Sequence, residues 1–502
     1  MIVRLRTVLV DVVPLRRGEW KLGLFLYGVL TLMVAADWVG KLGADALFVK
    51  RYGVNEIPKM YIVTPIVMLA VSGLIFYFVD RVRRRTMLIW YVASVTVSSL
   101  LIQWAISSGA TGAIQPISYI FAHGVKETIY ILFWVYAGNL YDVEQSKRLF
   151  PFFAGSVLVG KILGGAVGAG IAPLVHAENF IGAQAVGFAV CLIAIVLYRD
   201  LPEGEGLHAK IARRPSGLRE SLRDSVDGYR TVGADRLLRV FGLGVFFWYF
   251  LMQFANFLYL VGLDQSSASA TTQVGQEDVF SILYASVYTS SSLVALGIQS
   301  FITTPLVRRF GVARVLFALP LWYVGAYGVA SYAYGGNVAW LVLPAVIALQ
   351  IGERIVIPAI HRPATELVYS QIAAAIRPRA RAFLSGGVNA IGNMAAAIAL
   401  ILGIANLSTT ALLAAGAGSS AVYVATTWQT RRVFGRRIAQ NLASEDAAMR
   451  RSAVEMLRAD GAAVPTELLR AVAEEGTDEV AHGARLALTR RGVLAVAVDS
   501  AE

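Results

Sequence analysis

The chain has 502 residues, of which 57% are hydrophobic and only 16% are charged. Soluble proteins carry about a quarter of charged residues, so this composition excludes an ordinary soluble protein. The net charge of +12 does not indicate nucleic-acid binding, because the basic residues are sorted by position along the chain, as in proteins that keep Lys and Arg on the cytoplasmic side of a membrane.

Residues 1–20 contain no small-residue cleavage pattern and are predicted to be a retained cytoplasmic lead-in. After them, apolar runs of about 20 residues recur, each long enough to cross about 30 Å of hydrocarbon. The closely spaced period-2 segments of a membrane barrel are missing from the sequence, so we expect an all-α, polytopic membrane protein. Twelve spans are predicted, near 21–45, 57–80, 86–107, 114–140, 149–173, 179–198, 237–262, 277–304, 312–332, 338–361, 382–405 and 408–428.

The loops between these spans alternate in charge. One set is basic, whereas the opposing loops contain no Lys or Arg, except that Lys50, Arg51 and Lys59 flank the first outer turn. This alternation predicts that both termini are cytoplasmic. The basic loops are 80–85, 144–148, 199–236, 307–314, 377–381 and 431–437.

The order of the spans indicates a duplicated bundle. A six-span half at 21–198 is followed by a polar cytoplasmic linker at 199–236 and a second half at 237–430. "HGVKETIY" in span 4 can be aligned with "IGERIVIP" in span 10, which pairs Lys126 with Arg354. Two parallel halves are typical of transporters that hold a substrate between them near the midplane.

The C-terminal segment, 440–502, has a different composition, rich in alanine and charged residues. "AVEMLRADG" and "ARLALTRRG" share an Ala-x3-Leu-x3-Gly pattern, which predicts a small HEAT-like helical tail. So short a tail buries little apolar surface alone. We therefore expect it to pack on the cytoplasmic loops or on a cytoplasmic protein partner.

Charged side chains inside the spans are the candidate functional residues. Each costs about 2.5–3.5 kcal/mol on insertion scales, which calls for a partner or a task. At 100° per residue, His123, Lys126 and Glu127 share one face of span 4, and we expect this face to meet a similar face of span 10 in a water-accessible cavity. The other candidates are Asp37 and Lys41 in span 1, Lys161 in span 5, Glu353, Arg354 and His361 in span 10, and Asn389 in span 11.

Structural roles for these residues stay open. Asp37 and Lys41 are one turn apart and would suit a salt bridge within one helix. Lys126 and Glu127 are neighbours in the chain and diverge around the helix, so they neutralise each other poorly. Histidines such as His123 and His361 are more often hydrogen-bonded structural groups than proton carriers.

An excess of cations facing one cavity favours an anionic cargo, because Lys offers phosphate a point charge and Arg a bidentate fork. We therefore assign substrate binding to Lys41, Lys126, Lys161, Arg354 and Asn389. Charge compensation or proton coupling is assigned to Asp37, Asp45, Glu127, Glu353, His123 and His361. The loop residues Asp80, Arg81, Arg84, Arg308 and Arg309 are expected to act in gating. No nucleotide-hydrolysis loop, zinc spacing or nucleophile elbow stands out, so we expect no enzyme activity, metal or cofactor.

Three stretches carry a resemblance to a known family. They are "LRRGEWKLGLFLYGVLTLMVAADWVGKLGADALFVKRYGV" (15–54), "YDVEQSKRLFPFFAGSVLVGKILGG" (141–165) and "RARAFLSGGVNAIGN" (379–393). In these stretches the chain resembles the ATP/ADP translocases and their homologues in free-living bacteria, some of which append HEAT repeats. The resemblance implies twelve helices of the major facilitator type and exchange of nucleotides or related phosphate compounds, although Phe76 stands where the major facilitator loop signature has glycine.

Residue by residue, the resemblance is incomplete at the end of span 1. The translocases have an R-D-T-K-D type stretch there, with a functional lysine before its last aspartate. Asp45 matches that aspartate, but Ala44 stands at the lysine position and Lys41 at the arginine position. This departure argues against strict ATP/ADP exchange and leaves open a different anionic cargo.

The leading hypothesis is a secondary transporter that moves an anionic phosphorylated metabolite, such as a nucleotide, by alternating access. In this hypothesis Glu127 and Glu353 pair with the empty cations and so allow the carrier to return. One alternative is a proton-coupled exporter of small organic compounds. Another is a membrane scaffold that recruits a partner through its HEAT-like tail.

Overall fold

A computed structural model describes residues 16, 18–79, 82–141, 143–198, 232–268, 275–373 and 376–442, with shorter pieces between 444 and 489. Every secondary-structure element within these residues is a helix. Most of the predicted lead-in and linker lies outside them.

The helices form two compact units. One consists of Met1–Ser216 and Leu260–Leu293, and the other of Gly217–Tyr259 and Val294–Glu502. These units differ from the predicted halves in one respect. The segment from Leu260 to Leu293 belongs to the first unit, although it lies in the second predicted half. The sequence pattern did not indicate this placement, since it depends on packing between distant parts of the chain.

Unit 1 contains the helices of the first six predicted spans and is joined by the end of α9 and the start of α10. Short π- or 3₁₀-helical segments connect some of them. The elements are α2 (Trp20–Leu47), η1 (Phe48–Gly53), η2 (Val54–Glu56), α3 (Ile57–Val79), α4 (Arg84–Ser107), α5 (Ile114–Leu140), α6 (Val143–Val175), η3 (Ala177–Asn179), α7 (Phe180–Leu197), α9 (Arg236–Ala268) and α10 (Gln276–Gly297).

Unit 2 contains the remaining helices, and several of its spans are interrupted by short π-helical segments. Its elements after α10 are η4 (Ile298–Ile302), α11 (Thr303–Phe310), α12 (Val312–Val315), α13 (Ala318–Gly335), α14 (Ala339–Ile351), η5 (Gly352–His361), α15 (Arg362–Ser370), α16 (Arg377–Ala382), η6 (Phe383–Val388), α17 (Asn389–Asn406), α18 (Thr409–Leu442) and α20 (Thr466–Glu475).

Nine helical stretches within the described residues are long and apolar enough to cross a membrane. They support an integral membrane protein, while the count of twelve crossings stays a prediction. Helices α5 and α18 coincide with predicted spans but fall outside the nine. In α5 the reason is chemical, because His123, Lys126 and Glu127 lower its mean hydropathy.

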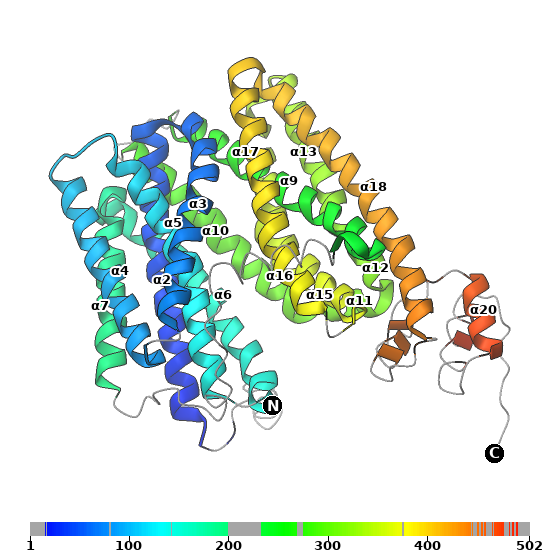
Figure 1. The fold of residues 1–502 in the computed structure, drawn as a ribbon. Helices are drawn as coiled ribbons and strands as arrows, with labels where there is room; N and C mark the ends of the chain where they lie inside the picture. The colour runs from blue at the N-terminus through cyan, green and yellow to red at the C-terminus, as the bar shows by residue number, and fades with distance from the viewer. Residues whose placement is uncertain are drawn as a thin grey trace, which may run out of the picture. The chain divides into compact units, whose positions relative to one another are not determined.

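Helix α2 is the centre of unit 1, where it packs on α5, α6 and α7 (Figure 1). Glycines permit the closest of these approaches. A Cβ added at Gly160 of α6 would lie 2.7 Å from the backbone oxygen of Thr31, and one at Gly164 would lie 2.6 Å from that of Ala35. Small residues spaced by four allow helix backbones to approach closely in membranes. The consequence is a buried α2 whose polar residues must find partners inside the bundle.

In unit 2, the chain of α14, η5 and α15 is one continuous helical stretch with a widened π-helical middle. Pro358 accounts for the widening, because it has no N–H to donate and its ring clashes with the carbonyl of Arg354, four residues earlier. This segment places Glu353, Arg354 and His361 on a stretch of irregular helix. Such π-helical insertions often occur at functional sites.

The predicted HEAT-like tail lies largely outside the described residues. Within 440–502, one regular helix is described over several turns, α20. Its Leu469 is fully buried, so the helix packs one apolar side against its surroundings. A HEAT repeat is a pair of such helices, and the pairing stays a prediction.

We expect that Gly164→Val disrupts unit 1, because the added side chain must push α6 away from the α2 backbone. Overpacking of this kind costs about 1–3 kcal/mol or more. Thermal unfolding of the purified protein in detergent measures the loss. Gly170→Val on the same helix is the matched control, since nothing lies within 4 Å of a Cβ at that position. Equal midpoints for the two variants would contradict the packing role.

Candidate functional site

A buried charged network joins α2 to α5 within unit 1. The Lys41 ammonium lies 2.5 Å from Asp45 Oδ2, one turn further along α2. The other carboxylate oxygen of Asp45 accepts a hydrogen bond from His123 Nε2 at 3.0 Å. Lys41 and Asp45 are 6% and 2% exposed. A pair so deeply buried is stable only because both oxygens of the carboxylate and the ammonium have partners.

Aromatic side chains complete the surroundings of Lys41. Its ammonium donates to the hydroxyl of Tyr284 on α10 at 3.1 Å and lies 5.6 Å from the ring centre of Trp38. Lys161 of α6 is a second cation beside Trp38, and its ammonium lies 5.7 Å from the same indole. Tyr288 packs on Trp38 with ring centres 3.8 Å apart. Both lysines therefore lie within the range of a cation–π contact with one indole.

Sequence reasoning did not select these three aromatic residues. Trp38 is next to the candidate Asp37, and Tyr284 and Tyr288 are one turn apart on α10. That spacing was the available signal. With aromatic residues at 11% of the chain, however, it does not distinguish a site from ordinary packing.

Asp37 is the second buried carboxylate of α2. It is 2% exposed, and its Oδ1 accepts no hydrogen bond. The cations whose charges act on it are Lys126, Lys41 and Lys161, from α5, α2 and α6. Asp37 is thus surrounded by positive charge without the close pairing that Asp45 has.

Lys126 and Glu127 occupy the more open part of the cluster. Their charged atoms are 3.3 Å apart, and their side chains are 32% and 57% exposed. An exposed ion pair is weak and readily exchanged, in contrast to the buried Lys41–Asp45 pair.

The structure bears on both pairings that the sequence left open. Lys41 pairs with Asp45 and not with Asp37, because His123 and Tyr284 hold the far end of that turn. Lys126 and Glu127 do form a pair, since long flexible side chains bridge the divergence of adjacent positions.

Unit 2 carries its own polar group around η5. Arg354 is 7% exposed, and its guanidinium lies 5.6 Å from the ring centre of Tyr259 on α9. The amide of Gln350 donates to Glu353 Oε2 at 2.9 Å and to Asn256 Oδ1 at 3.3 Å. A turn of α14, a turn of η5 and α9 therefore meet through polar side chains.

His361 and Asn389 of unit 2 lie in two other environments. His361 is buried, with Nε2 3.2 Å from the hydroxyl of Tyr423 on α18 and its ring edge-on to Trp248. Asn389 accepts a hydrogen bond from Asn393 at 2.7 Å, one turn along α17.

The predicted gating residues are described only in part. Asp80 and Arg81 lie outside the described residues, as does the side chain of Arg308. Arg84 is the first residue of α4, and Arg309 is exposed near the end of α11. Within the described residues, no group of three or more His, Cys, Asp or Glu side chains is arranged to hold a metal.

A second charged cluster of unit 1 lies at the end of α2 and explains the basic residues of the first outer turn. Lys50 Nζ lies 2.6 Å from Asp264 Oδ1 at the end of α9. Arg51 forms a bidentate pair with Glu277 at the start of α10, at 2.6 and 2.9 Å, and also contacts Glu178 at 2.8 Å. The outer basic residues thus fasten the segment from Leu260 to Leu293 to the rest of unit 1.

Asp278 adds another contact at the same end of the unit. Its Oδ2 accepts a hydrogen bond from His176 Nδ1 at 2.8 Å, and its Oδ1 accepts one from the backbone N–H of Ala177 at 2.6 Å. The hydrogen bond to Asp278 and the negative charge of that carboxylate raise the pKa of His176 above its ordinary value. The protonated imidazole therefore strengthens this contact.

Comparisons place the fold among known structures. No family model matches the chain, and no curated protein matches its sequence. The structure matches the nucleoside transporter NupG with a TM-score of 0.56 and 14% identity, over 82% of this chain and 98% of that one. It matches a D-xylose–proton symporter with a TM-score of 0.54 and 13% identity, over 82% and 97%. It matches the POT family transporter PepTSo with a TM-score of 0.55 and 12% identity, over 82% and 98%.

At these identities the likeness shows the fold alone. It confirms an all-α fold shared with these solved transporters, while the assignment to the major facilitator type stays a prediction. The resemblance to ATP/ADP translocases stays a prediction.

Replacing Asp45 should destabilise unit 1 severely. Asp45→Asn leaves the buried Lys41 ammonium without its carboxylate, and removing one partner of a buried pair costs about 3–5 kcal/mol. Thermal unfolding in detergent tests this, with Glu56→Gln as the control, because Glu56 pairs with Lys59 at the exposed surface. A loss no greater for Asp45→Asn than for the control would show that the buried pair does not stabilise the fold.

The His176 contact should make stability depend on pH. Because the folded pKa is raised, its contribution is fully present below the unfolded value of about 6.5 and is lost as pH rises through the raised value. Wild type should therefore unfold at a higher temperature than His176→Gln in acid, and the difference should vanish in base. A difference in unfolding temperature that does not change with pH would show that protonation of His176 does not stabilise the fold. Glu178 is the other acid acting on His176, so Glu178→Gln measures its share.

Proposed function

We propose that the chain is a secondary transporter, rather than an enzyme, which moves a small anionic phosphorylated solute, such as a nucleotide, by alternating access. The fold supports transport, since all three solved structures cited above are transporters. The observation that carries the anionic cargo is the intramembrane Lys126–Glu127 pair with Lys161 and Asp37 behind it. We assign the protein to the bacterial inner membrane on its resemblance to homologues in free-living bacteria, with both termini cytoplasmic on the charge of its loops.

Lys126 is the residue that meets the cargo in this proposal. Its side chain and that of Glu127 are partly exposed on a helix predicted to cross the bilayer, and exposure of charge to hydrocarbon is costly. Such a face is stable where it borders water. There a phosphate group can replace Glu127 as the partner of Lys126, because a charge-assisted hydrogen bond to phosphate is at least as favourable as a weak exposed pair.

The Lys126–Glu127 pair also suits the return of an empty carrier. Without cargo, an unpaired lysine inside the membrane would oppose the conformational change. Glu127 neutralises it at 3.3 Å. Release of the anion is then coupled to re-formation of the pair.

Lys41 has a different role in this proposal from the one predicted. Its ammonium is enclosed by Asp45, Tyr284 and Trp38, and no anion reaches it without breaking a buried pair. We assign it to anchoring α2. Lys161, which lies 5.7 Å from the Trp38 ring centre, is the second cation for the cargo.

In this scheme, the ion pairs at the end of α2 hold the transporter closed on the predicted outer side. Lys50 and Arg51 hold the ends of α9 and α10, near Asp264 and Glu277. Alternating access requires these helix ends to part from η1 on the predicted outer side. The Arg51 pairs are partly exposed, and such pairs are worth little individually, so they can break together at modest cost.

Proton coupling is the second candidate, and Asp37 is the observation that favours it. A buried carboxylate oxygen with no hydrogen-bond donor is costly when charged and is relieved by a proton. In a proton-driven carrier, Asp37→Asn would abolish accumulation driven by an imposed pH gradient but preserve exchange of solute for solute. Equal loss of both activities would reject this assignment.

Lys126→Ala should reduce uptake of the anionic solute by proteoliposomes about tenfold or more, the equivalent of one charge-assisted hydrogen bond. A panel of nucleotides and sugar phosphates, each tested as external and as internal solute, identifies the cargo first. Lys59→Ala is the matched control, since Lys59 is an exposed lysine of the same unit.

Two results would contradict the proposal. Unchanged uptake by Lys126→Ala would remove that residue from the binding site. Uptake of uncharged analogues at the same rate as phosphorylated ones would show that the transporter does not select an anionic cargo.

A further inference from the structure

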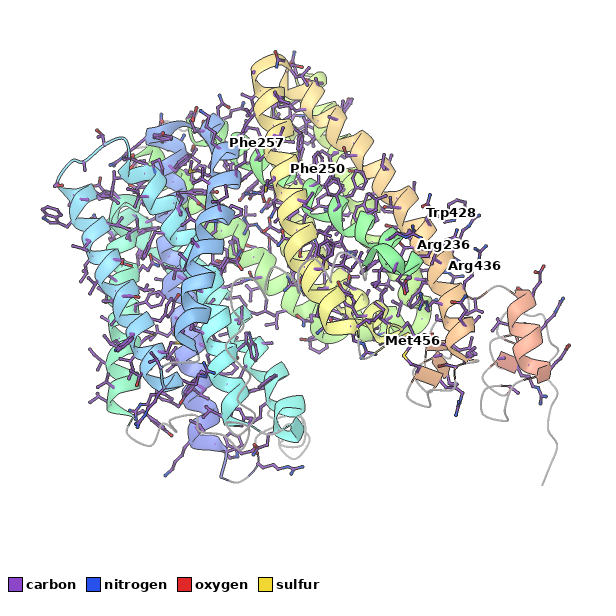
Figure 2. The ribbon with its side chains drawn as sticks, viewed as in Figure 1. Arg236, Phe250, Phe257, Trp428, Arg436 and Met456 are labelled. Carbon is purple, nitrogen blue, oxygen red and sulfur yellow. The ribbon has the colours of Figure 1, made fainter. Side chains whose placement is uncertain are left out.

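Unit 2 exposes a patch of arginines around one tryptophan, which the transport site does not use. The patch combines the start of α9 with the last turns of α18 (Figure 2). Its members are Arg236, Arg239, Trp428, Arg432 and Arg436, and all five are exposed. We refer to this set as the arginine patch.

An ion pair between the two helix ends assembles the patch. Asp235 Oδ2 lies 2.5 Å from Arg437 Nη2, so the neighbouring residues Arg236 and Arg436 are brought to the same end of the unit. Further along, Gly244 of α9 faces Tyr423 of α18, with 3.7 Å between its virtual Cβ and the tyrosine ring. The first turns of α9 therefore lie along α18, so Arg236 and Arg239 lie at the same end of unit 2 as the basic residues of α18.

Asp235, the acid that joins the two helix ends, already has several partners. Besides Arg437, Asp235 accepts hydrogen bonds from the backbone N–H groups of Leu237 and Leu238 at 2.8 and 3.2 Å. Among the residues that the structure describes, no ion pair or hydrogen bond is made by any patch arginine. The positive charge of the patch is thus available to an external anion.

Trp428 adds an exposed aromatic ring to the positive charge of the patch. Its side chain is 47% exposed, and the Arg432 guanidinium lies 3.5 Å from the ring centre, a stacking distance. Tryptophan prefers the boundary between lipid tails and headgroups. A stacked guanidinium keeps its N–H groups directed outward at that depth, where they match the geometry of a phosphate.

We propose that the arginine patch binds the headgroup of an anionic phospholipid. The patch lies where α18 passes from its apolar part, which ends near Thr426, into the basic segment 431–437. Basic pockets of this kind between helix ends recognise phosphate-bearing lipids. Positive-inside sorting alone accounts for scattered arginines, but it requires neither the Asp235–Arg437 pair that joins the two helix ends nor the stacking of Arg432 on Trp428.

Native mass spectrometry of the full-length protein tests the proposal. The detergent-solubilised chain is titrated with phosphatidylglycerol and, separately, with phosphatidylcholine. We expect preferential retention of phosphatidylglycerol, and an apparent affinity lowered about tenfold or more in Arg432→Gln/Arg436→Gln, since each basic residue near an anionic surface contributes substantially. Arg432→Lys/Arg436→Lys should recover part of the loss.

The matched control is Arg309→Gln/Arg314→Gln, which removes the same charge from another exposed part of unit 2. It should bind phosphatidylglycerol as wild type does. Equal affinity of the patch variant and wild type would overturn the proposal, and so would equal retention of phosphatidylcholine. An acidic peptide that binds in a patch-dependent way while phosphatidylglycerol does not would assign the surface to a protein partner instead.

Discussion

The cost of placing ionised side chains in a membrane-spanning helix governs the arrangement of unit 1. Helix α2 carries Asp37, Lys41 and Asp45 through the centre of the bundle, because the glycines of α6 allow it to be enclosed. Enclosure excludes water, so the charges must be matched within the protein. Asp45 is matched on both oxygens, by Lys41 and His123. Within the described residues, Oδ1 of Asp37 accepts no hydrogen bond, so Asp37 is the carboxylate of the cluster whose charge is matched least.

The same requirement separates two kinds of lysine. Lys41 is enclosed and fixed, whereas Lys126 is partly exposed and held by a weak pair. An exchangeable cation suits a transporter, since the cargo must be bound firmly enough to select it and loosely enough to release it. The pair that Arg51 makes with Glu277 is partly exposed as well, and it joins the segment from Leu260 to Leu293 to the rest of unit 1.

Hydropathy was sufficient to predict an all-α membrane protein and the positions of most helices, because the bilayer imposes its pattern on each segment locally. The choice of Asp45 over Asp37 as partner of Lys41 was not predictable, since both lie one turn away and only Tyr284 and His123, on other helices, distinguish them. The acids that hold the first outer turn are more than a hundred residues distant in sequence. The exchange of the segment from Leu260 to Leu293 into unit 1 likewise depends on contacts without a local signature.

The most direct test of the central claim compares a nucleoside with its phosphorylated form. Both share the base and sugar, so a difference in binding isolates the phosphate. Thermal unfolding of the purified protein in detergent measures this, because a ligand that binds the folded state raises its midpoint. The account predicts that a nucleotide raises the midpoint at concentrations at which the nucleoside does not. Equal stabilisation by both, or stabilisation by the nucleoside alone, would contradict an anion-binding role for the lysines of unit 1.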